Sequence, residues 1–442
     1  MKKIVALLLF PFYIFAQDED SLTVDLEISL EQKMRRNLVD LSIEDYVNLP
    51  NDEQVRKLSF YGFLDAGTEK YYGIEGTEVA KYKDENWEFK LPRFHLYGVS
   101  HLSKKFMVFF NIGHTVSSKN LELTNAWGNI KIKEGLQLRF GKMYRRFDLF
   151  NERLDQTAAI IGIDPPEMYD PTQYILPIYS LVMLHGNLPV KTSIFSYAFM
   201  LNNGESGAEK NVLPLGWDFR LKNDKFLVGT SGYTSNIGTN FSFPSVSFGT
   251  DSPQGAIRPW MQAEKYWVAG FYGEALINNI SLKGGYYFSY HQALRNPDKV
   301  LEVIKSISLE KDHLKNFVGK TNYQKPISEL SSTDVVVSTN YWVQTFYVRL
   351  AYHIYTPQGQ FIPFLFADYI ENPETIPDKN YGGSSKTGLA DDGAFFRPTL
   401  GLMYKPMDNV AIKSELSFYN AEILDQKLSY PELRFQIAYM FK

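Results

Sequence analysis

Eight charged residues lie close together between positions 139 and 155. Five are basic and three are acidic: Arg139, Lys142, Arg145, Arg146 and Arg153, with Asp148, Glu152 and Asp155. Charged side chains that line a narrow passage select ions of the opposite sign, and rings of Arg or Lys favour anions. The cluster therefore predicts a charged pore constriction with a preference for anions. Ordinary salt bridges within a loop are an equally good interpretation.

An apolar run, Ala158–Ile163, follows these charges within the segment 146–176. Such a run is unusual in a solvent-exposed loop, because apolar side chains gain free energy when they leave water. Pro165 and Pro166 then stiffen the chain. We expect the segment to pack against the inside of a wall. The alternative is a loop that covers a pore mouth or contacts a neighbouring subunit.

The sequence contains few of the residue patterns that catalysis needs. Nucleophilic catalysis needs a nucleophile and a base held together, but the chain has no cysteine and no Gly-x-Ser-x-Gly motif. The histidines show no spacing typical of a metal site: they are His95, His101, His114, His185, His291, His313 and His353. We therefore predict no catalytic residue, no metal and no cofactor.

The segments expected to hold these charged side chains in place alternate between apolar and polar residues, with a period of two. Leu433, Phe435, Ile437, Tyr439 and Phe441 alternate with Arg434 and Gln436. The segments around 285 and 350 alternate in the same way and place Lys283, Arg349 and His353 on the polar face. A mid-strand Arg or Lys is costly against lipid and tolerated in a water-filled lumen. The pattern predicts membrane strands with Lys283, Arg349, His353 and Arg434 facing the lumen.

Sixteen such strands can be placed along the chain. Their predicted bounds are 58–67, 86–99, 105–115, 121–132, 135–145, 177–187, 189–201, 212–222, 226–236, 260–277, 279–291, 340–355, 360–371, 393–406, 409–420 and 430–441. This predicts an all-β fold, a transmembrane antiparallel β-barrel of about sixteen strands.

Short and long connections alternate between these strands. The short turns are expected at His101–Lys104, Lys133–Glu134, Leu188, Asn223–Lys225, Asn278–Asn279, Pro357–Gly359 and Met407–Asp408. Most of the other connections are long, including 68–85, 237–259 and 292–339. Bacterial membrane barrels have short periplasmic turns and longer extracellular loops. The alternation therefore favours a membrane barrel over a soluble β-protein.

The N-terminus has the layout of a secretory signal peptide. Lys2 and Lys3 precede an apolar stretch, Ile4–Phe15, and Ala16 offers a cleavage position. Removal of residues 1–16 would change the net charge from −4 to −6. We expect residues 17–57 to form a periplasmic N-terminal segment, either helical or disordered, and residues 58–442 to form the barrel.

Loop 292–339 contains an amphipathic helical pattern in Val300–Ile304 and again in Leu309–Val318. The helices could cap the outer mouth or bind a partner. A surface helix that packs on its own loop is the favoured interpretation.

The chain resembles the sixteen-stranded outer-membrane porins and, within them, the phosphate-selective porin O/P-like group. The most specific feature is Leu138-Arg-Phe-Gly-Lys-Met-Tyr-Arg-Arg-Phe147, which is similar to a segment where strand five of that group enters the third loop. The proline-rich continuation of the group is absent here, so phosphate selectivity is not carried over. The resemblance implies a third extracellular loop that folds inward and narrows the pore, and a homotrimer.

Together these observations predict an outer-membrane porin, a water-filled channel for passive diffusion of small hydrophilic solutes or anions. It would contact outer-membrane lipid and no nucleic acid. The alternatives are a surface adhesin that binds through its long loops and, less favoured, an outer-membrane barrel enzyme. Single-channel conductance separates the three, since only the porin must conduct.

Overall fold

The computed structural model describes residues 58–72, 87–114, 121–153, 160–169, 179–201, 215–237, 261–307, 311–374, 394–423 and 426–441. The chain divides into two compact units, residues 1–39 and 40–442, and every described residue belongs to the second unit. The predicted signal peptide and the segment 17–57 lie outside the described residues. The same holds for Asp155 and for the first two residues of the apolar run, Ala158 and Ala159.

The described chain is dominated by long antiparallel strands. They are β1 (Leu58–Tyr71), β2 (Glu88–Ser103), β3 (Phe106–His114), β4 (Glu122–Lys133), β5 (Leu136–Tyr144), β6 (Tyr179–Val190), β7 (Ser193–Leu201), β8 (Leu215–Lys222), β9 (Phe226–Ile237), β10 (Met261–Ile277), β11 (Ile280–Arg295), β12 (Ser338–Tyr352), β13 (Ile354–Thr356), β14 (Gly359–Glu371), β15 (Ala394–Met407), β16 (Val410–Ile423) and β17 (Gln426–Phe441). β12 and β13 are one strand interrupted at His353, and both pair with β14. The barrel therefore has sixteen strands, as predicted.

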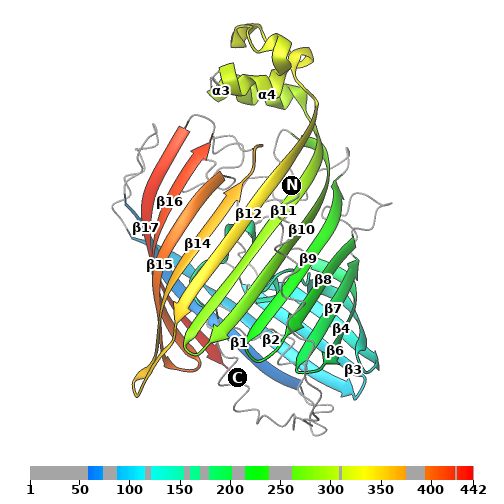
Figure 1. Ribbon diagram of the computed structural model, residues 1–442, viewed down its shortest axis with the longest axis vertical. Helices are drawn as coiled ribbons and strands as arrows, with labels where there is room; N and C mark the ends of the chain where they lie inside the picture. The colour runs from blue at the N-terminus through cyan, green and yellow to red at the C-terminus, as the bar shows by residue number, and fades with distance from the viewer. Residues whose placement is uncertain are drawn as a thin grey trace. The chain divides into compact units, whose positions relative to one another are not determined.

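The sheet closes on itself. β1 pairs with β17 from Gly62↔Phe441 to Tyr71↔Glu432, while its other edge pairs with β2. Each strand thus has a neighbour on both sides, and the strands run side by side at a slant around the barrel (Figure 1). In hydrocarbon every backbone N–H and C=O group needs an internal partner, which a closed barrel supplies. The predicted all-β, sixteen-strand antiparallel barrel is confirmed.

The two faces of the wall differ in chemistry. Leu365, in the middle of β14, is 55% exposed, whereas Asp368 on the other face of the same strand is buried. Leu350 and Arg349 on β12 show the same contrast. Exposed large apolar side chains therefore form the outer surface, and charged and aromatic side chains fill the inner one. Within the described parts of the chain, no helix has both the length and the apolar character needed to cross a bilayer.

Tight turns join the strands at one rim, mostly where the sequence predicts them. Asn278, between β10 and β11, has a positive φ of 53°, as the turns favoured in two-residue hairpins require. The turn predicted at Leu188 was misplaced, because β6 continues to Val190 and turns at Lys191, which has φ 52°. Beyond His185, β6 pairs only with β7, so Pro189 breaks no hydrogen bond toward β5.

Two helices, α3 (Pro297–Ile307) and α4 (Lys311–Asn322), lie in the connection between β11 and β12. Val300, Ile304, Leu314 and Phe317 are buried in a cluster that is continuous with Tyr341 of the barrel, and both helices also pack on the short 3-10 turns of the same connection. This fits the interpretation of helices that pack on their own loop. Arg295, at the end of β11, donates to the carbonyl oxygen of Asn316 at 2.8 Å and pairs with Glu374, just beyond β14. Arg295 thus links the insertion to the end of β11 and, through Glu374, to the end of β14.

Candidate pore constriction

The chain leaves β5 at Tyr144, and its next residues pack on inner-face side chains of β8 and β9. Arg146 Nε lies 3.3 Å from Asp218 Oδ1, and Glu152 Oε2 lies 3.0 Å from Arg220 Nη2. The Arg145 guanidinium is stacked 3.8 Å from the centre of the Tyr233 ring. Each of these charges is buried and faces a partner from the wall. Residues 145–153 are therefore held to the wall by polar contacts.

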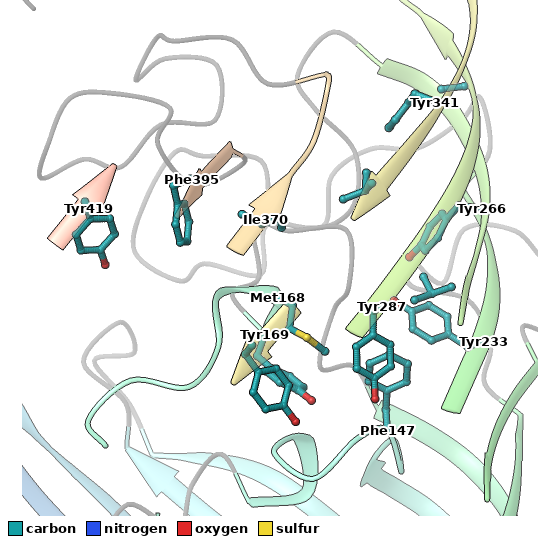
Figure 2. Packing of buried hydrophobic residues seen from close by; sticks show 14 of the residues in the cluster. Phe147, Met168, Tyr169, Tyr233, Tyr266, Tyr287, Tyr341, Ile370, Phe395 and Tyr419 are labelled. Atoms are coloured by element: carbon teal, nitrogen blue, oxygen red, sulfur yellow. The ribbon is translucent and has the colours of Figure 1, made fainter. Parts of the chain in front are cut away.

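Asp148 lies at the centre of this contact. Its backbone has φ 58°, its N–H donates to Ser231 Oγ at 3.2 Å, and its carboxylate accepts a 2.6 Å hydrogen bond from the hydroxyl of Tyr347. Beside it, Phe147 packs on Tyr287 with ring centres 4.8 Å apart (Figure 2). Asp148 thus connects the segment to β9 and β12 at once.

The second described part, residues 160–169, contacts side chains of β12 and β14–β17. Four of its main-chain groups are bound by side chains of the wall. Arg349 donates to the carbonyl oxygen of Ile161 at 2.8 Å, and Lys413 donates to that of Gly162 at 2.7 Å. The N–H of Ile163 donates to Glu415 Oε1 at 2.7 Å. Farther on, the N–H of Glu167 donates to Asp368 Oδ2, also at 2.7 Å. We call residues 160–169 the strap.

Two arginines converge on the acidic residues of the strap. Arg434 forms an ion pair with Asp164, and Arg397 Nη1 lies 4.0 Å from the same carboxylate and 3.9 Å from Glu167. The hydroxyl of Tyr419 accepts from Arg397 at 2.8 Å and from Arg434 at 3.4 Å. On the wall side, Arg397 pairs with Asp368 and Arg434 with Glu432. The guanidinium groups are thus held between wall and strap carboxylates.

Aromatic rings cover the inner wall near these contacts (Figure 2). His291 on β11 is sandwiched between Tyr266 and Tyr341, with ring centres 4.9 and 4.8 Å away. On β16 and β17, Tyr419 stacks on Tyr430 at 4.7 Å. Many tyrosines, among them Tyr266, Tyr341, Tyr419 and Tyr430, are therefore buried on the inner face of the wall.

The eight residues predicted for the constriction are placed differently from one another. Arg145, Arg146, Asp148 and Glu152 lie in the contact described above. Arg139 faces inward from β5 and stacks on Trp127, 4.1 Å from the ring centre. The side chain of Arg153 is outside the described part, as is Asp155.

Lys142 requires a correction. It is exposed on the opposite face of β5 from Arg139, and its ammonium donates to the carbonyl oxygen of Leu123 on β4 at 3.0 Å. Charge clustering suggested a constriction residue, although the alternation along β5 already separates positions 139 and 142. Lys142 therefore lies on the face of β5 opposite to the side on which the described contacts between the loop and the wall are made.

The four residues predicted to face the lumen lie on the inner face, and all are buried. Arg349 and Arg434 bind the strap, and the Lys283 ammonium lies 3.9 Å from the centre of the Phe150 ring. His353 instead lies between Ser281 and Gln360, each 2.9 Å from a ring nitrogen. Three of the four thus contact the segment 145–169.

Most of the wall residues that contact this segment were not predicted from the sequence. They are Asp218, Arg220, Asp368, Arg397, Lys413 and Glu415. Glu432, which pairs with Arg434 beside the segment, was not predicted either. The signal was present, because Asp218 and Arg220 are two positions apart on one strand, as are Lys413 and Glu415, and therefore share a face. Among the residues that the structure describes, no group of three or more histidine or acidic side chains could hold a metal ion.

Comparisons with known proteins bear on the fold. No protein-family model matches the sequence, and no curated protein does. An anion-selective porin from Comamonas acidovorans has a similar structure, with a TM-score of 0.51 and 10% identity over 87% of this chain and 99% of that one. The outer-membrane channel DcaP of Acinetobacter baumannii gives 0.50 and 8% identity over 89% and 99%. These likenesses show the sixteen-strand porin fold and do not confirm the narrower resemblance to the phosphate-selective group.

Proposed function

We propose that this protein is an outer-membrane porin that lets small hydrophilic solutes or ions diffuse passively, without catalysis. One observation carries the proposal: the closed sixteen-strand wall has apolar side chains outside and charged side chains inside. An apolar outer band suits hydrocarbon, and a barrel of this strand number is wide enough for an aqueous channel. Residues 1–16 would serve as the export signal.

The channel proposal includes a constriction formed by residues 145–169. The contacts of Arg146 with β8, Asp148 with β9 and β12, and the strap with β12 and β14–β17 support a segment that enters the lumen and narrows it. Arg139 would line the wall of the same lumen. A permeating solute would pass beside this segment, so its water-facing groups would select the solute.

The anion preference expected from the sequence has less support than the channel itself. Arg145 and Arg146, two of the residues expected to attract anions, are buried against Tyr233 and Asp218.

A homotrimer, inferred from the resemblance to porins, remains part of the proposal. Crosslinking of the native protein in membranes would test it, and a single band at the mass of the monomer would contradict it.

Reconstitution into planar lipid bilayers tests the channel. Purified protein should give discrete, ohmic conductance steps, and the same preparation after boiling should give none. Folding is checked beforehand by heat-modifiable gel migration, in which a closed barrel runs faster before boiling than after it. A preparation that is folded by this criterion and never conducts would contradict the proposed function.

A further inference from the structure

Water reaches the acidic charges of the strap more than the basic charges around it. The side chain of Asp164 is 30% exposed and that of Glu167 is 15% exposed. The two arginines that hold them, Arg397 and Arg434, are 3% and 7% exposed. An ion in the lumen would therefore approach the carboxylates more closely than the guanidinium groups.

The charges around these arginines do not balance. Among the residues that the structure describes, five carboxylates lie within 4.0 Å of the two guanidinium groups: Glu69, Asp164, Glu167, Asp368 and Glu432. Two positive charges thus face five formal negative charges. Lys413, Arg349 and Glu415, which contact the neighbouring strap residues, change the formal sum from minus three to minus two.

The described basic side chains at the start of the loop and on β8 beside it are buried and do not offset this excess at the water boundary. Arg146 and Arg220 are buried and paired with Asp218 and Glu152. Arg93, a basic residue of the inner wall that is 31% exposed, lies 3.0 Å from Asp65. Charges in a low-dielectric cleft focus the local field, so an acidic excess attracts cations and repels anions.

We propose that Asp164 and Glu167 determine the charge selectivity of the channel and make it prefer cations, which reverses the preference expected from the sequence. The inference rests on the proposed channel function. It assigns selectivity to the strap and not to the arginine-rich flank at 139–146. Small cationic or neutral solutes should accordingly pass more readily than anions of equal size.

The test is the reversal potential in a KCl gradient at low ionic strength, where the Debye length is about 10 Å or more and fixed charges are weakly screened. The unmodified channel should show a cation-to-anion permeability ratio above unity. Asp164→Asn should lower this ratio roughly two- to fivefold, the effect of one unit charge acting across a partly hydrated lumen. Glu167→Gln should act in the same direction and keeps the test valid if Asp164→Asn fails to fold.

Asp224→Asn is the matched control, because it makes the same chemical change at an exposed position in the turn between β8 and β9. The ratio should be unchanged in this variant. A channel that conducts but prefers anions, or whose ratio is unaffected by both strap substitutions, overturns the inference and leaves the channel function standing. Folded protein that shows no conductance overturns both.

Discussion

The ammonium of Lys413 donates a 2.7 Å hydrogen bond to the carbonyl oxygen of Gly162, although 251 positions separate the two residues. Glu415, the next inward residue of β16, accepts the N–H of Ile163 at 2.7 Å. The carbonyl of Gly162 and the N–H of Ile163 belong to the same peptide group. Two neighbouring side chains of the wall thus bind the carbonyl and the N–H of one peptide group of the strap. These two hydrogen bonds fix the position of the strap along β16.

Gly162→Ala should release the strap. Gly162 has φ 100°, and a Cβ there would lie 3.1 Å from Glu415 Oε1. A side chain at such a backbone conformation costs about 1–3 kcal/mol. We expect noisier single channels with a higher mean conductance. Gly216→Ala is the control, since its nearest contact is the flexible end of Met200 at 3.3 Å; an equal change in both variants would argue against a specific role of Gly162.

Arg220→Ala should strongly destabilise the barrel. Arg220 pairs with Asp218 at 2.6 Å and with Glu152 at 3.0 Å, and all three are buried. Removing one partner of a buried ion pair costs about 3–5 kcal/mol. The temperature at which the folded gel band disappears should fall clearly. Tyr272→Phe, which removes one hydroxyl bonded to the same pair, should lower it less; the reverse order would contradict this account.

Leu365→Arg should impair membrane insertion. Leu365 is at the middle of β14 and 55% exposed on the outer face. An arginine facing lipid costs about 2–4 kcal/mol at the bilayer midplane and about 0–1 kcal/mol near the interface. Tyr355→Arg, at the turn end of β13, should therefore be tolerated. Folding yield into lipid vesicles measures both, and equal yields would place the midplane elsewhere.

Glu374→Gln should loosen the helical insertion 296–337. The variant keeps the shape of the side chain but removes the charge that faces the buried Arg295. Hydrogen bonds to charged groups contribute roughly 1.5–3 kcal/mol. Trypsin should then cleave the insertion faster in folded protein. Glu302→Gln alters an exposed pair with Lys299 and should have little effect, so equal acceleration in both variants would contradict the role of Glu374.

Lys325→Ala should raise the titration midpoint of Asp334. The Lys325 ammonium, 2.7 Å away, and hydrogen bonds from Ser331 lower the pKa of Asp334 to about 2 from its usual 3.8. Because the pKa is lowered, the carboxylate supports the insertion at neutral pH, and its contribution is lost only as the pH falls through about 2. Carboxyl NMR should show the midpoint rise in the variant. Lys320→Ala, which removes a charge elsewhere on α4, should leave it unchanged.

The sequence by itself determined the barrel. The two-residue period is local, since adjacent side chains of a strand point to opposite faces and lipid and water select different residue types. That period placed Arg349 and Arg434 on the inner face and all sixteen strands near their observed positions. Turn chemistry also acts locally, which is why the turn at Asn278 was predicted correctly, although the turn predicted at Leu188 lies at Lys191.

Only the tertiary structure decided which charges face one another. Arg434 and Asp164 form an ion pair across 270 positions, and nothing near either residue in the sequence indicates the other. Their meeting depends on the closure of β1 on β17, on the register of each strand and on the path of the segment between β5 and β6. The same dependence buried Arg145 and Arg146 against wall residues and left Asp164 facing water, because burial follows from packing between distant segments and not from residue type.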